Sequence, residues 1–287
     1  MYEINRCVRH HRQILFHDKG GILMAERLII AHTPQEAVQA KSGDNAYLAG
    51  GTEAMRLGSE FARDAYVSLR RTEALRKVKR SSGKLEIGAS CTFQELMDSA
   101  DIPAYLKEAL QFMASRTRRN MATIGGNVAV CRDDSFLVPT LLAASASVSL
   151  MNKDESSEEV GLEQYIAGRD KYKDCLILSI NLPDGAIVKS ARSANTAQSH
   201  ARLTAALGKN DGKYMAYAAI KNYGLVKLGG IAEKMSSADN LSEDEITDYL
   251  KNDAKIALED DLLYGGADYR KYLLGITFAQ MYQELKG

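Results

Sequence analysis

The sequence predicts an α+β fold, in which short strands and helices alternate in the first half and an antiparallel sheet with helices follows. Three observations predict it. Apolar strand-like runs alternate with capped helical segments up to about residue 175, a hairpin pattern surrounds Gly224, and an amphipathic helical segment ends the chain. The 287 residues are 45% hydrophobic, which suffices for the cores of two domains or of one elaborate domain.

The first subdomain is predicted over residues 27–82. Thr33 is followed by Pro34 and, three residues after the threonine, by Glu36, a capping pattern that predicts a helix after the first strand. Three apolar runs predict short strands at residues 27–31, 46–50 and 65–69.

A second subdomain is predicted over residues 83–174. Thr92 and Glu95 form another capping box at the start of a helix. Residues 102–119 have apolar side chains at helical spacing and end in cations, which predicts one amphipathic helix. Residues 136–151 predict a buried helix followed by a strand.

The third unit, over residues 175–287, is predicted to be an antiparallel α+β domain. It begins with a strongly apolar strand and ends with an amphipathic helix. The elements predicted are a strand at 175–185, a hairpin of 213–224 and 225–234, a helix capped by Ser242 and Glu245, and a helix at 269–285.

Charge and cysteine content exclude several classes of protein. Lys and Arg equal Asp and Glu at 37 each, so no net field attracts nucleic acid or an anionic membrane. The N-terminus lacks the continuous apolar region of a secretory signal, and no run reaches the roughly 20 apolar residues of a spanning helix. A reducing cytoplasm, without disulfides or cysteine-rich metal sites, is predicted by the wide separation of Cys7, Cys91, Cys131 and Cys175.

Two glycine pairs are candidate anion-binding loops, in "AGGTE" (49–53) and "TIGGN" (123–127). Without a Cβ atom, a glycine backbone can approach a ligand and direct N–H groups at an anion. Considered singly, each pair is more often a turn, and neither fits the GxGxxG fingerprint or a phosphate loop with Lys-Ser or Lys-Thr. Two such loops together would grip a pyrophosphate through backbone dipoles rather than lysines.

Seven segments occur in a characteristic order from about residue 27 onward: "LAGGTEAM", "LEIGASCTFQEL", "RRNMATIGGNVA", "PTLLAASASVSL", "LILSINLPDG", "KLGGIAEK" and "YGGADYRKYL". In this order and spacing the chain resembles the FAD-binding medium subunit of molybdenum hydroxylases, of the xanthine dehydrogenase and carbon monoxide dehydrogenase type. The resemblance implies a two-subdomain FAD-binding fold of the vanillyl-alcohol-oxidase (PCMH) type, over 27–82 and 83–174. A C-terminal α+β domain with an antiparallel sheet follows over 175–287.

The resemblance also implies which residues bind FAD. The first loop would wrap the pyrophosphate and ribitol, the second would oppose it, an aspartate would lie near the adenosine side, and a lysine would approach the flavin ring. It implies no acid or base catalyst and no metal ligand. The implied cofactor-binding residues are Leu48, Ala49, Gly50, Gly51, Thr52, Glu53, Thr123, Ile124, Gly125, Gly126, Asn127, Asp134 and Lys189.

The sequence departs from the family pattern after the second loop. The family usually has Ser-Pro-x-x-Asp there, whereas "CRDDSFLVP" places Phe136 at the aspartate position. We expect the acid at Asp134 or Asp133, and a loop acid that caps the following helix is an equally good interpretation. On the nicotinamide-docking side, a Ser/Ala/Gln-rich run ending in His200 replaces charged residues usual in the family.

Other candidates have structural interpretations that we favour. Met113 falls where some relatives have an aromatic residue near the flavin, and packing in the core is the preferred role. Three arginines close together have two interpretations: they neutralise phosphate, or they form the solvated end of a helix, which is the interpretation we prefer. They are Arg116, Arg118 and Arg119.

Residues 1–26 lie outside the resemblance. The residues directly before Met24, "KGGIL", are what a ribosome-binding purine tract would encode if translated, so Met24 is the expected natural start. Surface positions rather than metal ligation are expected for His10, His11 and His17.

By resemblance, this chain is the flavin subunit of a heteromeric complex. A molybdopterin-binding large subunit would oxidise the substrate, and a ferredoxin-like small subunit with two-iron two-sulfur clusters would pass the electrons on. FAD on this chain would receive them and release them to NAD or another acceptor. Two alternatives stay open: a free-standing FAD oxidoreductase of the same fold, such as a relative of UDP-N-acetylenolpyruvylglucosamine reductase, and a non-flavin assembly or scaffold subunit.

Overall fold

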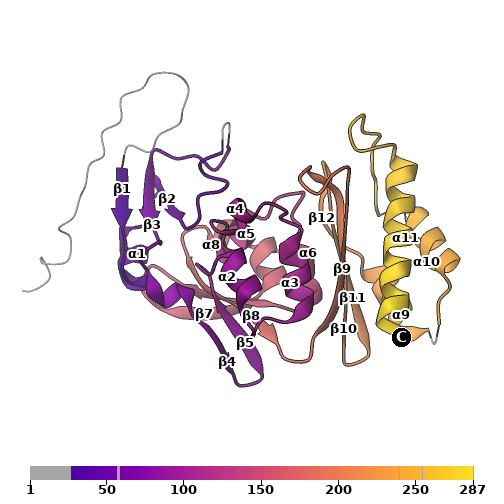
Figure 1. Cartoon of the computed structure of the whole chain (residues 1–287), viewed down its shortest axis with the longest axis horizontal. Helices are drawn as coiled ribbons and strands as arrows, with labels where there is room; N and C mark the ends of the chain where they lie inside the picture. The colour runs from indigo at the N-terminus through magenta and orange to yellow at the C-terminus, as the bar shows by residue number, and fades with distance from the viewer. Residues whose placement is uncertain (1–26, 57–58, 239, 254, 287) are drawn as a thin grey trace, which may run out of the picture.

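The computed structural model describes residues 27–56, 59–238, 240–253 and 255–286, which form three β-sheets with their helices. The sheets follow one another along the longest axis of the molecule, from the N-terminal sheet to the C-terminal helices (Figure 1). The expectations about residues 1–26, including the start at Met24 and the three N-terminal histidines, lie outside the described residues.

The N-terminal sheet has three parallel strands in the order β1-β3-β2. The predicted cap of its helix is confirmed, since Thr33 Oγ1 accepts a hydrogen bond from the Glu36 N–H. The Glu36 carboxylate accepts from the N–H of His32, one residue before the cap. The elements are β1 (Arg27–Ile30), α1 (Pro34–Ala40), β2 (Asn45–Leu48), β3 (Ala65–Ser68) and the 3-10 helix η1 (Glu73–Arg76).

The middle sheet is antiparallel, with the order β4-β5-β8-β6-β7. Strand β8 lies at its centre, although the expected boundary at residue 174 groups this segment with the C-terminal domain. The strand is buried at nearly every position, and such a strand needs neighbours on both edges and cover on both faces. The strands are β4 (Val78–Ser81), β5 (Lys84–Gly88), β6 (Ser147–Met151), β7 (Ser157–Gly161) and β8 (Leu176–Pro183).

Seven short helices accompany the middle sheet. The single helix predicted over residues 102–119 is wrong, because it divides into two. The Arg119 guanidinium donates to the carbonyls of Met113 and Ala114, and Ser115 Oγ caps a new helix, so side chains replace helical hydrogen bonds at the break. The helices are α2 (Phe93–Asp98), α3 (Ala104–Gln111), α4 (Arg116–Arg119), α5 (Ile124–Val130), α6 (Val138–Ala143), α7 (Leu162–Ala167) and α8 (Arg169–Tyr172).

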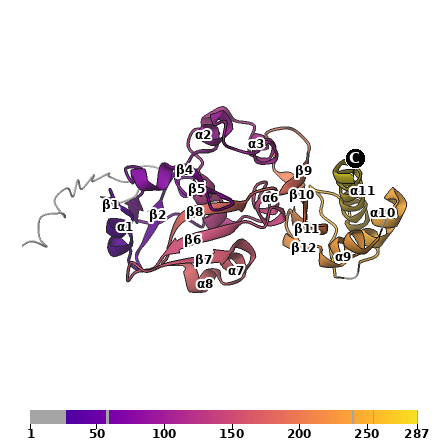
Figure 2. The ribbon, with the colours of Figure 1, turned by 90° about the horizontal axis from the view of Figure 1, so that it is seen from below.

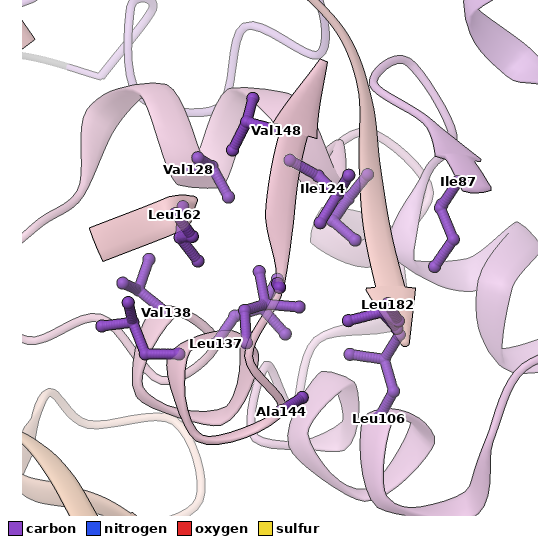
Figure 3. Packing of buried hydrophobic residues seen from close by; sticks show 14 of the residues in the cluster. Ile87, Leu106, Ile124, Val128, Leu137, Val138, Ala144, Val148, Leu162 and Leu182 are labelled. Carbon is purple, nitrogen blue, oxygen red and sulfur yellow. The ribbon is translucent and has the colours of Figure 1, made fainter. Parts of the chain in front are cut away.

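The main hydrophobic core fills the space between these helices and the middle sheet (Figure 3). Ile124 of the second glycine loop, Leu137 and Val148 are fully buried there. Because the Ile124 side chain is held in this core, the loop that carries it is anchored to the rigid part of the molecule. The capping box predicted at Thr92 and Glu95 is confirmed at the start of α2.

The C-terminal sheet is antiparallel, with the order β12-β11-β10-β9. The predicted hairpin through Gly224 is confirmed, but residues 229–237 form a helix, not the second half of the hairpin strand. That helix buries Ile231 and Met235, four residues apart on one face. The elements are β9 (Ile187–Ala194), β10 (Ala201–Asn210), β11 (Lys213–Ile220), β12 (Gly224–Lys227), α9 (Gly229–Ser237), α10 (Glu243–Lys251) and α11 (Ala267–Lys286).

This sheet lies between helices, with α6 of the middle unit on one face and α9 and α11 on the other (Figures 1 and 2). The capping box at Ser242 and Glu245 is confirmed at the start of α10. None of the helices in the described part of the chain is long and apolar enough to cross a membrane.

The contact between α6 and β10 predicts a strong effect of one added methyl group. A Cβ on Gly208 would lie 1.9 Å from the carbonyl oxygen of Ala143, so Gly208→Ala must separate the helix from the sheet. We expect it to lower the free energy of unfolding by about 3 kcal/mol in urea titrations. Gly161→Ala is the matched control, because an added Cβ there meets nothing within 4 Å. Equal stability of the two variants would contradict the prediction.

Candidate functional site

A cavity of about 1130 Å³ lies where the N-terminal sheet, the helices of the middle unit and the connection between β9 and β10 meet. Both predicted glycine loops line it, although 75 residues of sequence separate them. Further parts of the wall come from three other segments, which contribute Ala89, Ser90, Arg132, Asp134, Ser135, Phe136, Gln198, Ser199 and His200. The cavity is thus enclosed by parts of the chain that lie far apart in the sequence.

The first glycine loop follows β2 directly and has unpaired backbone donors. Gly51 has a φ of +72°, a left-handed conformation that favours glycine. Within the described part of the chain, the N–H groups of residues 50–54 donate to no protein acceptor. A row of unpaired N–H groups at a cavity wall is a concave donor surface suited to an anion.

The second glycine loop is built differently. It forms the first turn of α5, and its N–H groups are paired within the protein: Gly125 donates to the carbonyl of Ala89, and Gly126 to Thr123 Oγ1. A Cβ on Gly125 would lie 2.8 Å from the same Ala89 oxygen, so the glycine permits close backbone packing. Of the two loops expected to offer backbone dipoles to an anion, only the first has a row of N–H groups that are unpaired within the described residues.

The two loops are joined by a direct backbone contact. A Cβ on Gly50 would lie 1.8 Å from the carbonyl oxygen of Met121, immediately before the second loop. Only glycine fits there without displacement of one loop from the other. Gly50 is therefore required for the assembly of the cavity wall, and Gly51 for the turn of the donor row.

A chain of ion pairs crosses the cavity wall. Arg132 bridges two carboxylates, with Nη1 3.0 Å from Glu53 Oε2 and Nε 2.8 Å from Asp134 Oδ1. Asp134 Oδ2 lies 2.5 Å from Nδ1 of His200, at the start of β10. The chain of pairs thus connects the first glycine loop, the turn after α5 and the C-terminal sheet.

The Asp134 carboxyl is buried, and its partners decide its ionisation. Burial by itself would raise its pKa, but the hydrogen bonds from Arg132 and His200 and the nearby charge of Lys221 lower the pKa to about 2. Lys221 also pairs with Asp133, at 2.9 Å, so both predicted alternatives for the acid are bound to the protein itself. Both carboxylates thus have basic partners within the protein.

The structure brings all the predicted site residues to the cavity except Ile124 and Lys189. Ile124 points into the hydrophobic core. Lys189 Nζ pairs with Glu284 Oε2 at 3.0 Å, whereas Arg192 of the same strand lines the cavity. Residues three apart on a strand point to opposite faces, which explains why Arg192 lines the cavity and Lys189 does not.

The favoured interpretation of Met113 agrees with its burial in the main core, although it also lines the cavity. The three arginines of α4 differ. Arg116 is exposed and Arg119 braces the backbone, while Arg118 lines the cavity with Nη2 3.8 Å from Glu53. Sequence reasoning missed Arg132, whose only signal was a basic residue in the departing segment "CRDDSF".

The described residues offer binding chemistry and no metal centre. No group of three or more His, Cys, Asp or Glu side chains in this part of the chain is arranged to hold a metal ion. Burial raises the pKa of the Cys175 thiol at the cavity wall, which keeps it from acting as a thiolate nucleophile. Cys91, Cys131 and Cys175 form no disulfide.

The Asp134 pairs predict a specific pH dependence of stability. Its folded-state pKa of about 2 lies below the unfolded value, so its contribution is complete above about pH 4 and is lost as the pH falls through about 2. At pH 7 we expect Asp134→Asn to lower the free energy of unfolding by about 1 to 2 kcal/mol. Urea titrations from pH 7 to pH 2 should show wild type and variant converging, and a constant difference would refute this account.

The comparisons with known proteins agree with this architecture. Residues 24–185 match the family described as the FAD binding domain in molybdopterin dehydrogenase. The Escherichia coli K12 protein YgfM is 28% identical over 269 residues, which cover 91% of this chain and 96% of YgfM. Quinoline 2-oxidoreductase from Pseudomonas putida 86 has a chain of the same fold, with a TM-score of 0.76 at 17% identity, covering 90% of this chain and 95% of its own.

A chain of the CO dehydrogenase from Oligotropha carboxidovorans also has this fold, with a TM-score of 0.73 at 19% identity, covering 89% of this chain and 96% of its own. The three sheets with their helices are therefore the FAD-binding fold predicted from the sequence, and the cofactor is FAD. The chain belongs to the family of FAD-binding domains of the molybdopterin dehydrogenases.

Proposed function

We propose that this chain is the FAD-binding electron-transfer subunit of a molybdenum-containing hydroxylase or dehydrogenase. The observation that carries the proposal is the cavity in which a row of unpaired backbone donors faces the wall formed by the second glycine loop. Family membership supports the same cofactor.

The residues present fit a dinucleotide with a pyrophosphate. The unpaired N–H groups of residues 50–54 need acceptors, which phosphate oxygens supply. Ser90, at the cavity wall, is nine-tenths buried with no hydrogen-bond partner for Oγ within the described residues. Its hydroxyl is a further donor in need of an acceptor.

In this proposal, the two FAD-binding subdomains are residues 27–82 and residues 83–174, with β8 completing the sheet of the second. The C-terminal domain closes the site through His200. Leu48 to Glu53 wrap the pyrophosphate and ribitol, while Thr123, Gly125, Gly126 and Asn127 form the opposing wall. FAD supplies the redox chemistry when bound. The chain binds it, orients it and shields it from water.

The proposed partners are a ferredoxin-like subunit with two-iron two-sulfur clusters, which supplies electrons, and a molybdopterin-binding subunit, which oxidises the substrate. The acceptor is NAD or another oxidant. The similar structures belong to a quinoline 2-oxidoreductase and a CO dehydrogenase, which supports membership in a redox complex. The absence of a cysteine cluster in the described residues accords with clusters on another chain.

Flavin titration tests the role of the first loop. Gly51 and Gly185 have φ values of +72° and +79°, so alanine at either costs about 1 kcal/mol of backbone strain. Only Gly51 lines the cavity. We expect wild type and Gly185→Ala to bind one FAD per chain, and Gly51→Ala to bind it at least about tenfold more weakly because the donor row is reoriented. Equal losses in both variants would contradict a role of this loop in binding.

Co-purification tests the role as a subunit. Full-length tagged chain, expressed in its natural host, should retain a molybdopterin-containing protein and a two-iron two-sulfur protein in stoichiometric amounts, identified by metal analysis and mass spectrometry. A solitary yellow protein that is reduced directly by a small-molecule donor would instead support a free-standing flavin oxidoreductase. A protein that binds no flavin would support the scaffold alternative.

A further inference from the structure

Arg132 is the most constrained charged group of the cavity wall. Its side chain is 21% exposed and is fixed at both ends of the guanidinium, to Asp134 through Nε and to Glu53 through Nη1. Within the described residues, Nη2 donates to nothing. A planar group held at two of its nitrogens has its remaining donors oriented in advance.

The charge balance around Arg132 leaves a positive surplus. Glu53 is paired with three arginines: Arg132 at 3.0 Å, Arg56 at 3.4 Å and Arg118 at 3.8 Å. Asp134 also pairs with Lys221, which pairs in turn with Asp133. Four positive groups therefore meet three carboxylates, and the network has a surplus of one positive charge.

The position of this surplus identifies the missing anion. Glu53 belongs to the row of unpaired N–H groups at residues 50–54, and Arg132 is hydrogen-bonded to its carboxylate. We therefore expect an anion that accepts from this row to come close to the guanidinium of Arg132. Phosphate suits both sets of donors, because guanidinium groups bind it through paired N–H groups and backbone N–H groups cradle it.

We propose that Arg132 is a phosphate-binding residue of this site, with Glu53 and Asp134 as the positioning residues that orient it toward the pyrophosphate of FAD. The proposal rests on the proposed FAD-binding function and adds a charged donor to it. It also assigns the Glu53 carboxylate to the orientation of an arginine, while the Glu53 N–H stays in the donor row proposed to bind the cofactor.

The alternative is that Arg132 only neutralises the two carboxylates and so stabilises the wall. The two roles differ in their dependence on the ligand. If the arginine is only structural, its substitution lowers the affinity for every flavin that enters the cavity. If it binds phosphate, its substitution lowers the affinity for FAD and FMN but not for riboflavin, which has no phosphate.

Titration of apoprotein, followed by flavin fluorescence, separates these roles. The forms compared are wild type, Arg132→Gln, Arg132→Lys and Arg116→Gln, and the ligands are FAD, FMN and riboflavin, with inorganic pyrophosphate as a competitor. Arg116 is the matched control because it is exposed on α4 and makes no ion pair within the described residues. Thermal unfolding of each apoprotein establishes that it is folded.

We expect Arg132→Gln to weaken FAD binding about 10- to 100-fold, the loss of a hydrogen bond to a charged group, and to leave riboflavin binding within about twofold. Pyrophosphate should displace FAD from wild type and compete at least about tenfold less effectively in the variant. Arg116→Gln should behave as wild type. If Arg132→Gln does not fold, the test uses Arg132→Lys, which keeps a positive charge beside Asp134. We expect this variant to bind FAD several-fold more weakly than wild type and to bind riboflavin with unchanged affinity.

Two results overturn the proposal: unchanged FAD affinity in a folded Arg132 variant, or an equal loss for FAD and riboflavin. A wild-type chain that binds no flavin at all refutes the proposed function itself, and the assignment of Arg132 fails with it. Binding of FAD by wild type with no effect at Arg132 overturns only the assignment of Arg132.

Discussion

The site depends on one backbone contact, in which Gly50 lies against the carbonyl oxygen of Met121. This contact places the end of the parallel N-terminal sheet against the segment that leads into α5, and α5 is anchored in the main core through Ile124. No side chain can intervene, so the distance between the loops is set by van der Waals contact between main-chain atoms. A rigid wall of this kind holds a ligand without a cost of reorganisation at the moment of binding.

The two glycine loops have different structural roles, although their sequences are similar. The second loop uses its N–H groups to bind Ala89 and Thr123 and is a supporting structure. The first loop leaves its N–H groups unpaired and is the donor surface. Glycine is required at Gly50 and Gly125 because the backbone packs too closely there for a Cβ atom, and at Gly51 because φ is positive.

Ion pairs connect this wall to the C-terminal domain. A series of side-chain contacts runs from the first loop to the start of β10, through Glu53, Arg132, Asp134 and His200. Lys221 adds a second link through its ion pair with Asp133. Because both Asp133 and Asp134 are engaged, the acidic residues that replace the usual family pattern serve this connection. The segment "CRDDSF" is therefore compatible with an intact cavity, since its arginine lines the cavity and pairs with Glu53 of the first loop.

The sequence by itself determined the fold class, the family, the capping boxes at Thr92 and Ser242, and a set of site residues nearly all of which line the cavity. These follow from local patterns and from ordered motifs. Only the tertiary structure decided that Arg192 rather than Lys189 reaches the cavity, that β8 completes the middle sheet, and that Arg132 meets Glu53. The physical reason is that hydrogen-bond partners and strand facing depend on which distant segments are brought together, and ion pairs across 79 residues leave no local signal.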